Sequence, residues 1–245
     1  MVDYLYDGTF EGLMCCIYDH YYAEKASGIF RKEMYQQTIL CGFHEVESDE
    51  EKALRVYNAI NSKISPSDME RIYRVFLSES ENKEIKILRY VILGFKEGAK
   101  IRLLHGNPIV FDVQQIERKV IGEVHRLAGL IRFSVLKGDV LYARIEPDHD
   151  VTELLADHFC DRFKNDPFII HDEKRSKALI ARGGDWYISD FDAKCLPQVT
   201  QEEERYRQMW RKYFGTIAIK ERINPKCQKN FMPVRYWKNL TEKLL

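Results

Sequence analysis

The spacing of the apolar residues changes near the middle of the chain, and this change constrains the fold more than any other feature. From residue 48 to about residue 132, apolar residues recur every three or four positions, as at Val113, Ile116 and Val120, which is the spacing of helices with one buried face. After Gly129 the chain instead holds short apolar runs separated by turn residues, which is typical of strands. The sequence therefore predicts an α+β fold with a mainly helical N-terminal part and a sheet after it.

The N-terminal part is expected to combine helices with a pair of edge strands. Strands are predicted at residues 4–6 and 37–46, the second from the alternation of Ile39, Cys41 and Phe43. Thr9 is a plausible N-cap for a helix that continues to Tyr21. Four more helices are expected between residues 48 and 132, beginning with the acidic turn at residues 48–51 and with the serine-proline start at residues 65–68.

The second part is expected to be an antiparallel sheet. Residues 131–136 and 140–145 flank a short turn at residues 137–139 and predict a hairpin. An amphipathic helix is predicted at residues 152–164, three further strands at residues 168–170, 178–180 and 186–188, and a last helix at residues 201–219 ahead of a basic extension. We expect domains at residues 1–130 and 131–245, or one continuous domain with this internal change of pattern.

Composition excludes several classes of protein. No apolar run approaches the roughly 20 residues that cross a bilayer, and the first residues lack the order of a secretory signal. The six cysteines, at positions 15, 16, 41, 160, 195 and 227, form no C-x-x-C pair. We therefore expect a cytoplasmic protein that contacts no membrane and carries no metal, disulfide or other cofactor.

The charge of the chain is unevenly distributed although its total is zero. Residues 201–245 hold 11 Lys and Arg against 5 Asp and Glu, whereas the preceding 200 residues hold 27 against 33. Such a basic end favours a polyanionic partner, because cations suit phosphates, amides suit base or sugar edges, and aromatic rings can stack on bases. The nucleic-acid-binding candidates in this end are Arg222, Asn224, Lys226, Gln228, Lys229, Arg235, Tyr236 and Trp237. In the alternative interpretation, Tyr236 and Trp237 pack against the core at the C-terminal end, and the lysines only form the solvent-exposed side of this segment.

His125 and Arg132 flank a predicted junction between helix and strand. Gly129 lies between them, so both polar side chains could line the opening of one site, where the absence of a glycine side chain allows close approach to the backbone. Alternatively, Gly129 is only the C-cap of the helix and His125 interacts with its last carbonyls. The pattern leaves both interpretations open.

His149 lies between two carboxylates, Asp148 and Asp150. Their charges are expected to raise its pKa, and a histidine so placed could act as a general acid or base near neutral pH. Asp150 is most simply explained as the N-cap of the helix that follows.

His158 and Arg162 are four residues apart and should share a face of that helix. Together with Arg132 they could hold a phosphate. In the alternative interpretation, His158 is buried and hydrogen bonded, and Arg162 pairs with a neighbouring aspartate, Asp161 or Asp166.

Several motifs together resemble a bacterial family of DNA-repair or DNA-metabolism proteins built around a domain of unknown function. The matching segments are residues 6–12 (YDGTFEG), 125–133 (HRLAGLIRF), 147–150 (PDHD), 158–159 (HF), 162–163 (RF) and 221–225 (ERINP). The resemblance implies a partner that is a radical S-adenosylmethionine (radical SAM) protein acting on DNA, and similar domains occur fused to uracil-DNA-glycosylase-like modules. Nothing in this chain resembles a glycosylase.

The sequence holds no recognisable catalytic set, because it lacks a phosphate loop, a nucleophile elbow, an H-E-x-x-H pair and a deaminase zinc signature. We therefore expect a DNA-binding accessory protein of a repair or modification system, which binds single-stranded or damaged duplex DNA for its radical SAM partner. One alternative is a nucleic-acid-processing enzyme, with His125, Asp148 and His149 as its catalytic group and with His158 or Glu221 as further acid/base candidates. The other is an adaptor that binds protein only.

Overall fold

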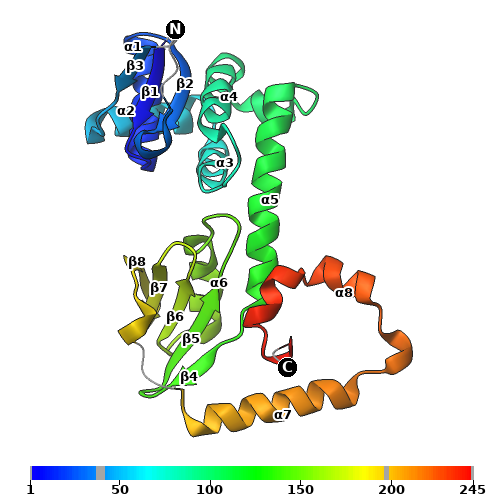
Figure 1. The fold of residues 1–245 in the computed structure, drawn as a ribbon. Helices are drawn as coiled ribbons and strands as arrows, with labels where there is room; N and C mark the ends of the chain where they lie inside the picture. The colour runs from blue at the N-terminus through cyan, green and yellow to red at the C-terminus, as the bar shows by residue number, and fades with distance from the viewer. Residues whose placement is uncertain (1, 37–41, 196–198, 244–245) are drawn as a thin grey trace. The chain divides into compact units, whose positions relative to one another are not determined.

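The computed structural model describes residues 2–36, 42–195 and 199–243. It confirms the α+β fold (Figure 1). The chain forms two compact units, Met1–Ile121 and Gly122–Leu245, and helix α5 (Pro108–Leu130) runs across the division between them. The domain boundary predicted at residues 130 and 131 stays a prediction.

Unit 1 contains a parallel three-stranded sheet with the order β2-β1-β3. Its strands are β1 (Val2–Tyr6), β2 (Ala26–Arg31) and β3 (Gly42–Glu45), and helix α1 (Phe10–Tyr22) connects the first two. The hydroxyl of Thr9 accepts a hydrogen bond from the amide of Gly12 at 2.9 Å, as expected of the predicted N-cap. Strand β2 was not predicted, while Ile39 and Cys41 of the predicted second strand lie outside the described residues.

The four predicted helices of this region are α2 (Glu50–Lys63), α3 (Pro66–Phe76), α4 (Lys83–Glu97) and α5. Asp49 caps α2 and Ser65 caps α3 through their side chains. Within unit 1, Arg71 on α3 pairs with Glu117 on α5 at 2.7 Å and with the buried Asp68 at 2.7 Å. Paired charges of this kind can remain in a largely apolar core because each is compensated by its neighbour.

Unit 2 contains a five-stranded sheet with the order β4-β5-β6-β7-β8. The strands are β4 (Ser134–Leu136), β5 (Val140–Ile145), β6 (Phe168–Asp172), β7 (Lys177–Arg182) and β8 (Asp185–Asp190). The predicted hairpin is confirmed, but β5 and β6 pair in parallel, which corrects the expectation of a wholly antiparallel sheet. The physical reason is helix α6 (Ala156–Phe163), which carries the chain back along the sheet between these two strands.

The helix of this crossover begins differently from the prediction. A 3₁₀ turn, Glu153–Leu155, precedes α6, and the side chain of neither Thr152 nor Leu155 makes a capping hydrogen bond. Asp150 instead accepts a hydrogen bond from Lys177 on β7 at 2.7 Å, so its expected role as an N-cap is wrong. The carboxylate of Asp150 thus links the connection between β5 and α6 to strand β7.

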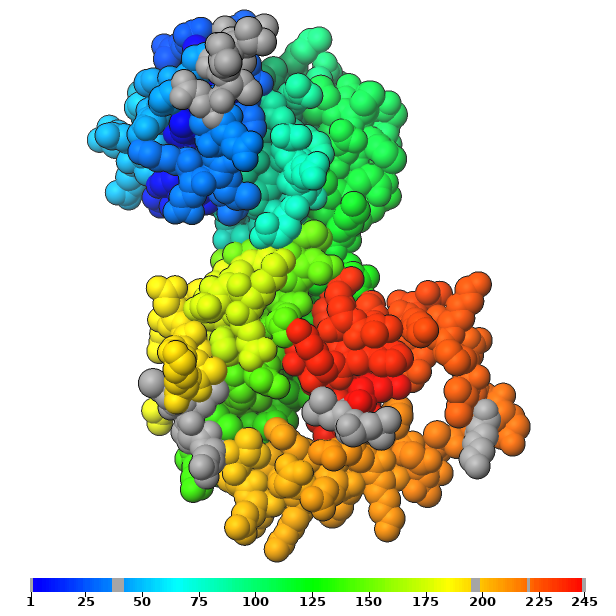
Figure 2. All heavy atoms as spheres, in the orientation of Figure 1, coloured from blue at the N-terminus to red at the C-terminus, as the bar shows by residue number. Residues whose placement is uncertain are grey.

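The last part of the described chain contains two α-helices and three 3₁₀ helices. These are, in chain order, α7 (Gln201–Ile217), η5 (Lys220–Arg222), α8 (Pro225–Phe231), η6 (Val234–Asn239) and η7 (Thr241–Lys243), all within unit 2. The end of the chain, in red in Figure 2, lies against the part of unit 2 that holds the sheet, and η6 contacts β5. Helix α7 buries none of its residues. Among the helices of the described residues, none is both long and apolar enough to cross a membrane.

Candidate nucleic-acid interface

Glu123 on α5 joins three separate parts of unit 2. The residue is 1% exposed, and its carboxylate accepts hydrogen bonds from the amide of Asp148 at 2.9 Å, the amide of His149 at 2.8 Å and the hydroxyl of Tyr236 at 2.6 Å. A buried carboxylate needs such compensation, because removing a charge from water is costly. The four residues, called the Glu123 anchor below, thus hold the β5–α6 connection and η6 against α5.

The electrostatics of the Glu123 anchor favour the ionised form of the Glu123 carboxylate. Burial alone would raise the pKa of Glu123, but the hydrogen bonds from Tyr236, Asp148 and His149 outweigh it and hold this pKa below its ordinary value. Burial, followed by the hydrogen bond to Glu123, raises the pKa of Tyr236 to about 12. At neutral pH the tyrosine therefore donates its proton in a hydrogen bond and the glutamate accepts it.

Asp148 is also held from the sheet side and from the C-terminal end. Its carbonyl accepts hydrogen bonds from Lys174 at 3.2 Å and Arg175 at 3.0 Å, and its carboxylate pairs with Arg235 at 2.9 Å. The backbone and the side chain of Asp148 thus serve to fix the connection, and Arg235 is committed to this contact.

The structure brings only two of the three predicted catalytic residues together. Asp148 and the half-buried His149 lie at the Glu123 anchor, whereas His125 is exposed on α5. Two residues along a helix correspond to roughly 200° of rotation, so His125 points away from the face of α5 that carries Glu123. The Glu123 anchor itself was not predicted.

Arg132 does not lie free to bind a phosphate. Its guanidinium pairs with Glu242 at 2.7 Å and donates to the carbonyl of Gly129 at 3.1 Å. Burial would raise the pKa of Glu242, but the contacts with Arg132 outweigh it and lower this pKa. Gly129 lies inside α5, so its alternative role as a C-cap is wrong, and Arg132 satisfies a carbonyl of the last turn instead.

His158 and Arg162 are both exposed on α6, so the alternative in which His158 is buried is wrong. Within the described residues Arg162 forms no ion pair with Asp161 or Asp166, and its guanidinium lies 5.8 Å from the centroid of the Phe163 ring. Arginine is followed by phenylalanine at residues 132–133 and again at residues 162–163, and the packing of the two phenylalanines explains this repeat. Phe133 and Phe163 pack edge to face with centroids 4.8 Å apart inside unit 2.

A cleft of about 380 Å³ in unit 2 is lined by four cations that sequence reasoning largely missed. They are Arg132, Arg144, Arg207 and Lys238. Each has a carboxylate partner, respectively Glu242, Glu173, Glu203 and Glu146. An anion entering this cleft would have to compete with these carboxylates, so the cleft is a weaker phosphate site than its four cations alone suggest.

The apolar residues of α7 form one exposed stripe at helical spacing, made of Tyr206, Met209, Trp210, Tyr213 and Ile217. Trp210 and Tyr213 stand with ring centroids 5.7 Å apart and an interplanar angle of 31°. The indole nitrogen of Trp210 donates to Glu242 at 3.2 Å, and Glu242 is in turn held by Arg132. Two residues distant in sequence, Glu242 and Arg132, thus fix the orientation of the Trp210 ring.

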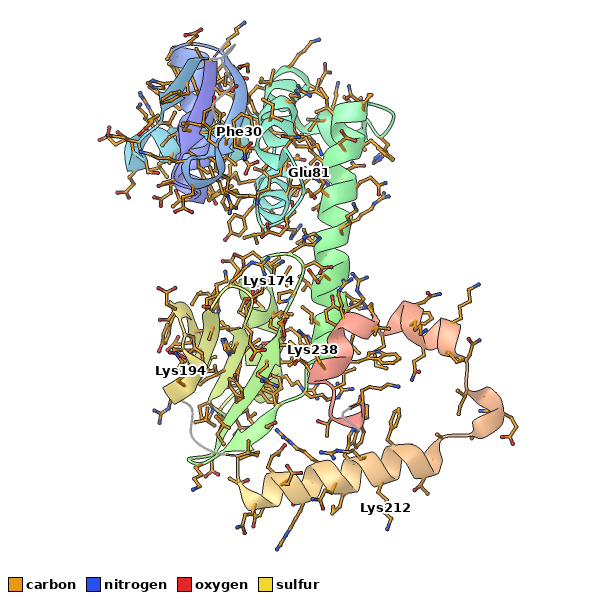
Figure 3. The ribbon with its side chains drawn as sticks, viewed as in Figure 1. Phe30, Glu81, Lys174, Lys194, Lys212 and Lys238 are labelled. Carbon is orange, nitrogen blue, oxygen red and sulfur yellow. The ribbon has the colours of Figure 1, made fainter. Side chains whose placement is uncertain are left out.

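The cations between α7 and η6 differ from those of the cleft. Arg222, Lys226 and Lys229 are exposed and form no ion pair within the parts of the chain that the structure describes. Lys212 likewise projects from α7 in Figure 3 without such a pair among the described residues. These four side chains remain available to a polyanion.

The other predicted binding residues of this end are capping residues or are partly or fully buried. Asn224 caps α8 by accepting from the amide of Cys227 at 3.0 Å, and Gln228 is half-buried in α8. Tyr236 is 3% exposed and offers no free ring face, so stacking on it is excluded in this conformation and it closes the core instead. Trp237 is half-buried and donates to the carbonyl of Met232 at 2.9 Å.

Comparison with known proteins places the chain in a family. Residues 81–242 match the family described as "Domain of unknown function (DUF4130)", so the chain belongs to it. No protein of curated function matches the sequence. The structure is similar to that of a pGpG-specific phosphodiesterase, PggH, from Vibrio cholerae, with 8% identity, a TM-score of 0.36, and coverage of 89% of this chain and 100% of that chain. A likeness at this TM-score carries no argument about function.

Proposed function

We propose that this member of the DUF4130 family is a cytoplasmic DNA-binding accessory protein of a repair or modification system that acts with a radical SAM partner. The family resemblance described above suggests the partner. The observation that supports DNA binding is the set of exposed cations between α7 and η6, of which Arg222, Lys226 and Lys229 have no carboxylate partner among the described residues.

The charge of this region favours a polyanion. Residues 205–241 hold ten lysines and arginines against one glutamate. Some of these cations pair with carboxylates elsewhere in unit 2, as Arg235 does with Asp148 at 2.9 Å. The unpaired ones can neutralise phosphates and release the counterions of the nucleic acid, which is the main source of affinity in nonspecific binding.

The aromatic stripe of α7 favours a single strand over an intact duplex. Tyr206 is 64% exposed, Tyr213 is 54% exposed and Trp210 is 42% exposed, so all three offer ring faces to solvent. Proteins that bind single strands combine such rings with nearby cations, because unpaired bases have free faces to stack. The bases of an intact duplex already stack on one another, and damage or strand opening would expose them.

The test is a binding titration with fluorescently labelled single-stranded and duplex DNA at two salt concentrations. A triple variant, Arg222→Gln with Lys226→Gln and Lys229→Gln, should weaken binding regardless of base sequence. Because this variant can no longer neutralise three phosphates, the slope of log affinity against log salt should fall by about two units for a single strand.

A second triple variant, Lys25→Gln with Lys100→Gln and Arg182→Gln, removes the same charge from exposed positions elsewhere and should bind as the wild type does. The titrations are repeated with the radical SAM partner present. Equal effects of the two triple variants would show that only net charge matters, and absence of DNA binding with and without the partner would overturn the proposal.

A further inference from the structure

Unit 1 contains a cleft that the proposed DNA-binding role does not use. Its volume is about 530 Å³, within the range of small-molecule sites. Residues of α1, α2 and α4 line it, and its floor is formed by Ile17, which is fully buried, and Val56, which is 7% exposed. The cleft lies far from the basic end in sequence, and its lining residues apart from Phe95 precede the part of the chain that matches the family.

Four aromatic rings form the walls of this cleft. Tyr18 and Tyr22 stack with centroids 4.4 Å apart and an interplanar angle of 28°, and Tyr21 meets Phe95 edge to face at 5.8 Å. Tyr21 is 47% exposed and Tyr22 is 76% exposed, so both rings keep much of their surface open to solvent. Ring faces and edges that remain open around an apolar floor suit a flat, aromatic ligand.

Two cations stand against these rings. Arg55 donates to the hydroxyl of Tyr18 at 3.3 Å, and the ammonium group of Lys63 lies 5.9 Å from the centroid of the Phe95 ring. Neither cation forms an ion pair within the described residues, and no carboxylate lines the cleft there. Their charge is therefore available to an anionic group of a ligand whose apolar part touches the rings.

We propose that this cleft binds a nucleotide, with the base against the tyrosine rings and the phosphate at the cations that line the cleft, Arg55 and Lys63. A neutral aliphatic ligand would leave both cations without a partner, an anionic aliphatic ligand would offer no flat face to stack on the rings, and an inorganic anion would make no use of the four rings. A nucleotide matches both the rings and the cations of the cleft, because its base is flat and aromatic and its phosphate is joined to the base through one sugar. The ligand is either a free mononucleotide or a nucleotide unit of a single strand, which share this chemistry.

The experiment is a calorimetric titration of the full chain with deoxyadenosine monophosphate. Saturable binding is expected, and Tyr21→Leu and Lys63→Gln should each weaken it about tenfold, through loss of stacking and of the phosphate contact respectively. Tyr57→Leu and Arg89→Gln are matched controls, because both residues are exposed on α2 and α4 but do not line the cleft. They should bind as the wild type does.

Three further arms decide the outcome. Inorganic phosphate should bind at least tenfold more weakly than the nucleotide, since it gains nothing from the rings. In a competition experiment, a short single-stranded oligonucleotide is added to the complex with the mononucleotide. Displacement of the mononucleotide would identify the ligand as a nucleotide unit of a single strand, and no displacement would identify it as a free mononucleotide. The triple variant of Arg222, Lys226 and Lys229 should keep its affinity for the mononucleotide, so failure of the DNA-binding proposal leaves this one standing.

Three results would overturn the proposal of a nucleotide site. They are the absence of saturation at millimolar nucleotide, unchanged affinity in both cleft variants, and phosphate binding as tight as nucleotide binding.

Discussion

Removal of one hydroxyl group tests whether the Glu123 anchor holds unit 2 together. Tyr236→Phe keeps the ring in the core but deletes the donor that lies 2.6 Å from the carboxylate of Glu123. Because Glu123 is only 1% exposed, water cannot easily replace this donor. Hydrogen bonds to charged groups are worth about 1.5–3 kcal/mol, so the free energy of unfolding of unit 2 should fall by about 2 kcal/mol.

Tryptophan fluorescence during urea unfolding measures this loss in unit 2. All three tryptophans, Trp186, Trp210 and Trp237, lie in that unit. The midpoint of unfolding should move to lower urea with an unchanged slope, because the mutation alters an interaction and not the surface exposed on unfolding. Tyr187→Phe is the control, since Tyr187 is 58% exposed and its hydroxyl makes no hydrogen bond within the described residues. It should change stability by less than about 0.5 kcal/mol.

The effect of Tyr236→Phe should also depend on pH. The pKa of Glu123 is lower in the folded chain than its ordinary value, so the ionised carboxylate contributes stability above the unfolded pKa of about 4.3. This contribution is lost as the pH falls through the folded pKa, and the difference between wild type and variant should shrink over the same range. A loss below about 0.5 kcal/mol at neutral pH, or a loss equal to that of the Tyr187 control, would refute the assigned role of the Glu123 anchor.

Three further predictions concern the aromatic stripe of α7, the histidines and metals. Arg132→Gln should release Glu242 and shift the emission of Trp210, and it should weaken single-strand binding with an unchanged salt slope, whereas loss of a direct phosphate contact would lower the slope by about 0.7 units for a single strand. His125→Ala and His149→Ala should leave a partner-dependent DNA reaction at full rate, and loss of turnover with unchanged DNA affinity would instead favour the enzyme alternative. Elemental analysis of the chain after anaerobic purification should find no stoichiometric iron or zinc, and finding either would contradict the inference from cysteine spacing.

Local signals were sufficient to predict most of the helices. Thr9, Asp49 and Ser65 cap the helices that follow them, because capping depends on residues within one turn. Strand β2 was missed because its neighbour in the sheet, β1, is separated from it by helix α1 and because its apolar run is short. The parallel pairing of β5 with β6 was missed for a related reason, since strand direction is set by the crossover and not by the residues of the strands.

The candidate site was less predictable than the fold. Glu123 looks like one of many charged residues on a helix, although one local signal could have identified it. It lies at helical spacing with the buried Val120 and Leu127, so it is an acid on an apolar face and needs partners there. Those partners, Asp148 and Tyr236, come from segments 25 and 113 residues away, and no local pattern indicates them.

The Glu123 anchor also bears on the choice between a binding protein and an enzyme. A general acid or base works best when its pKa lies near the pH of the reaction, but Glu123 is held in its ionised form by its hydrogen bonds. The carboxylate of Asp148 pairs with Arg235. The backbone amide of Asp148 donates a hydrogen bond to Glu123, and its carbonyl accepts one from Arg175. These groups therefore position the C-terminal end of the chain more readily than they transfer protons. Under the proposed function, the exposed cations that follow α7 depend on that end being held in place, so loss of the Glu123 anchor should weaken DNA binding indirectly.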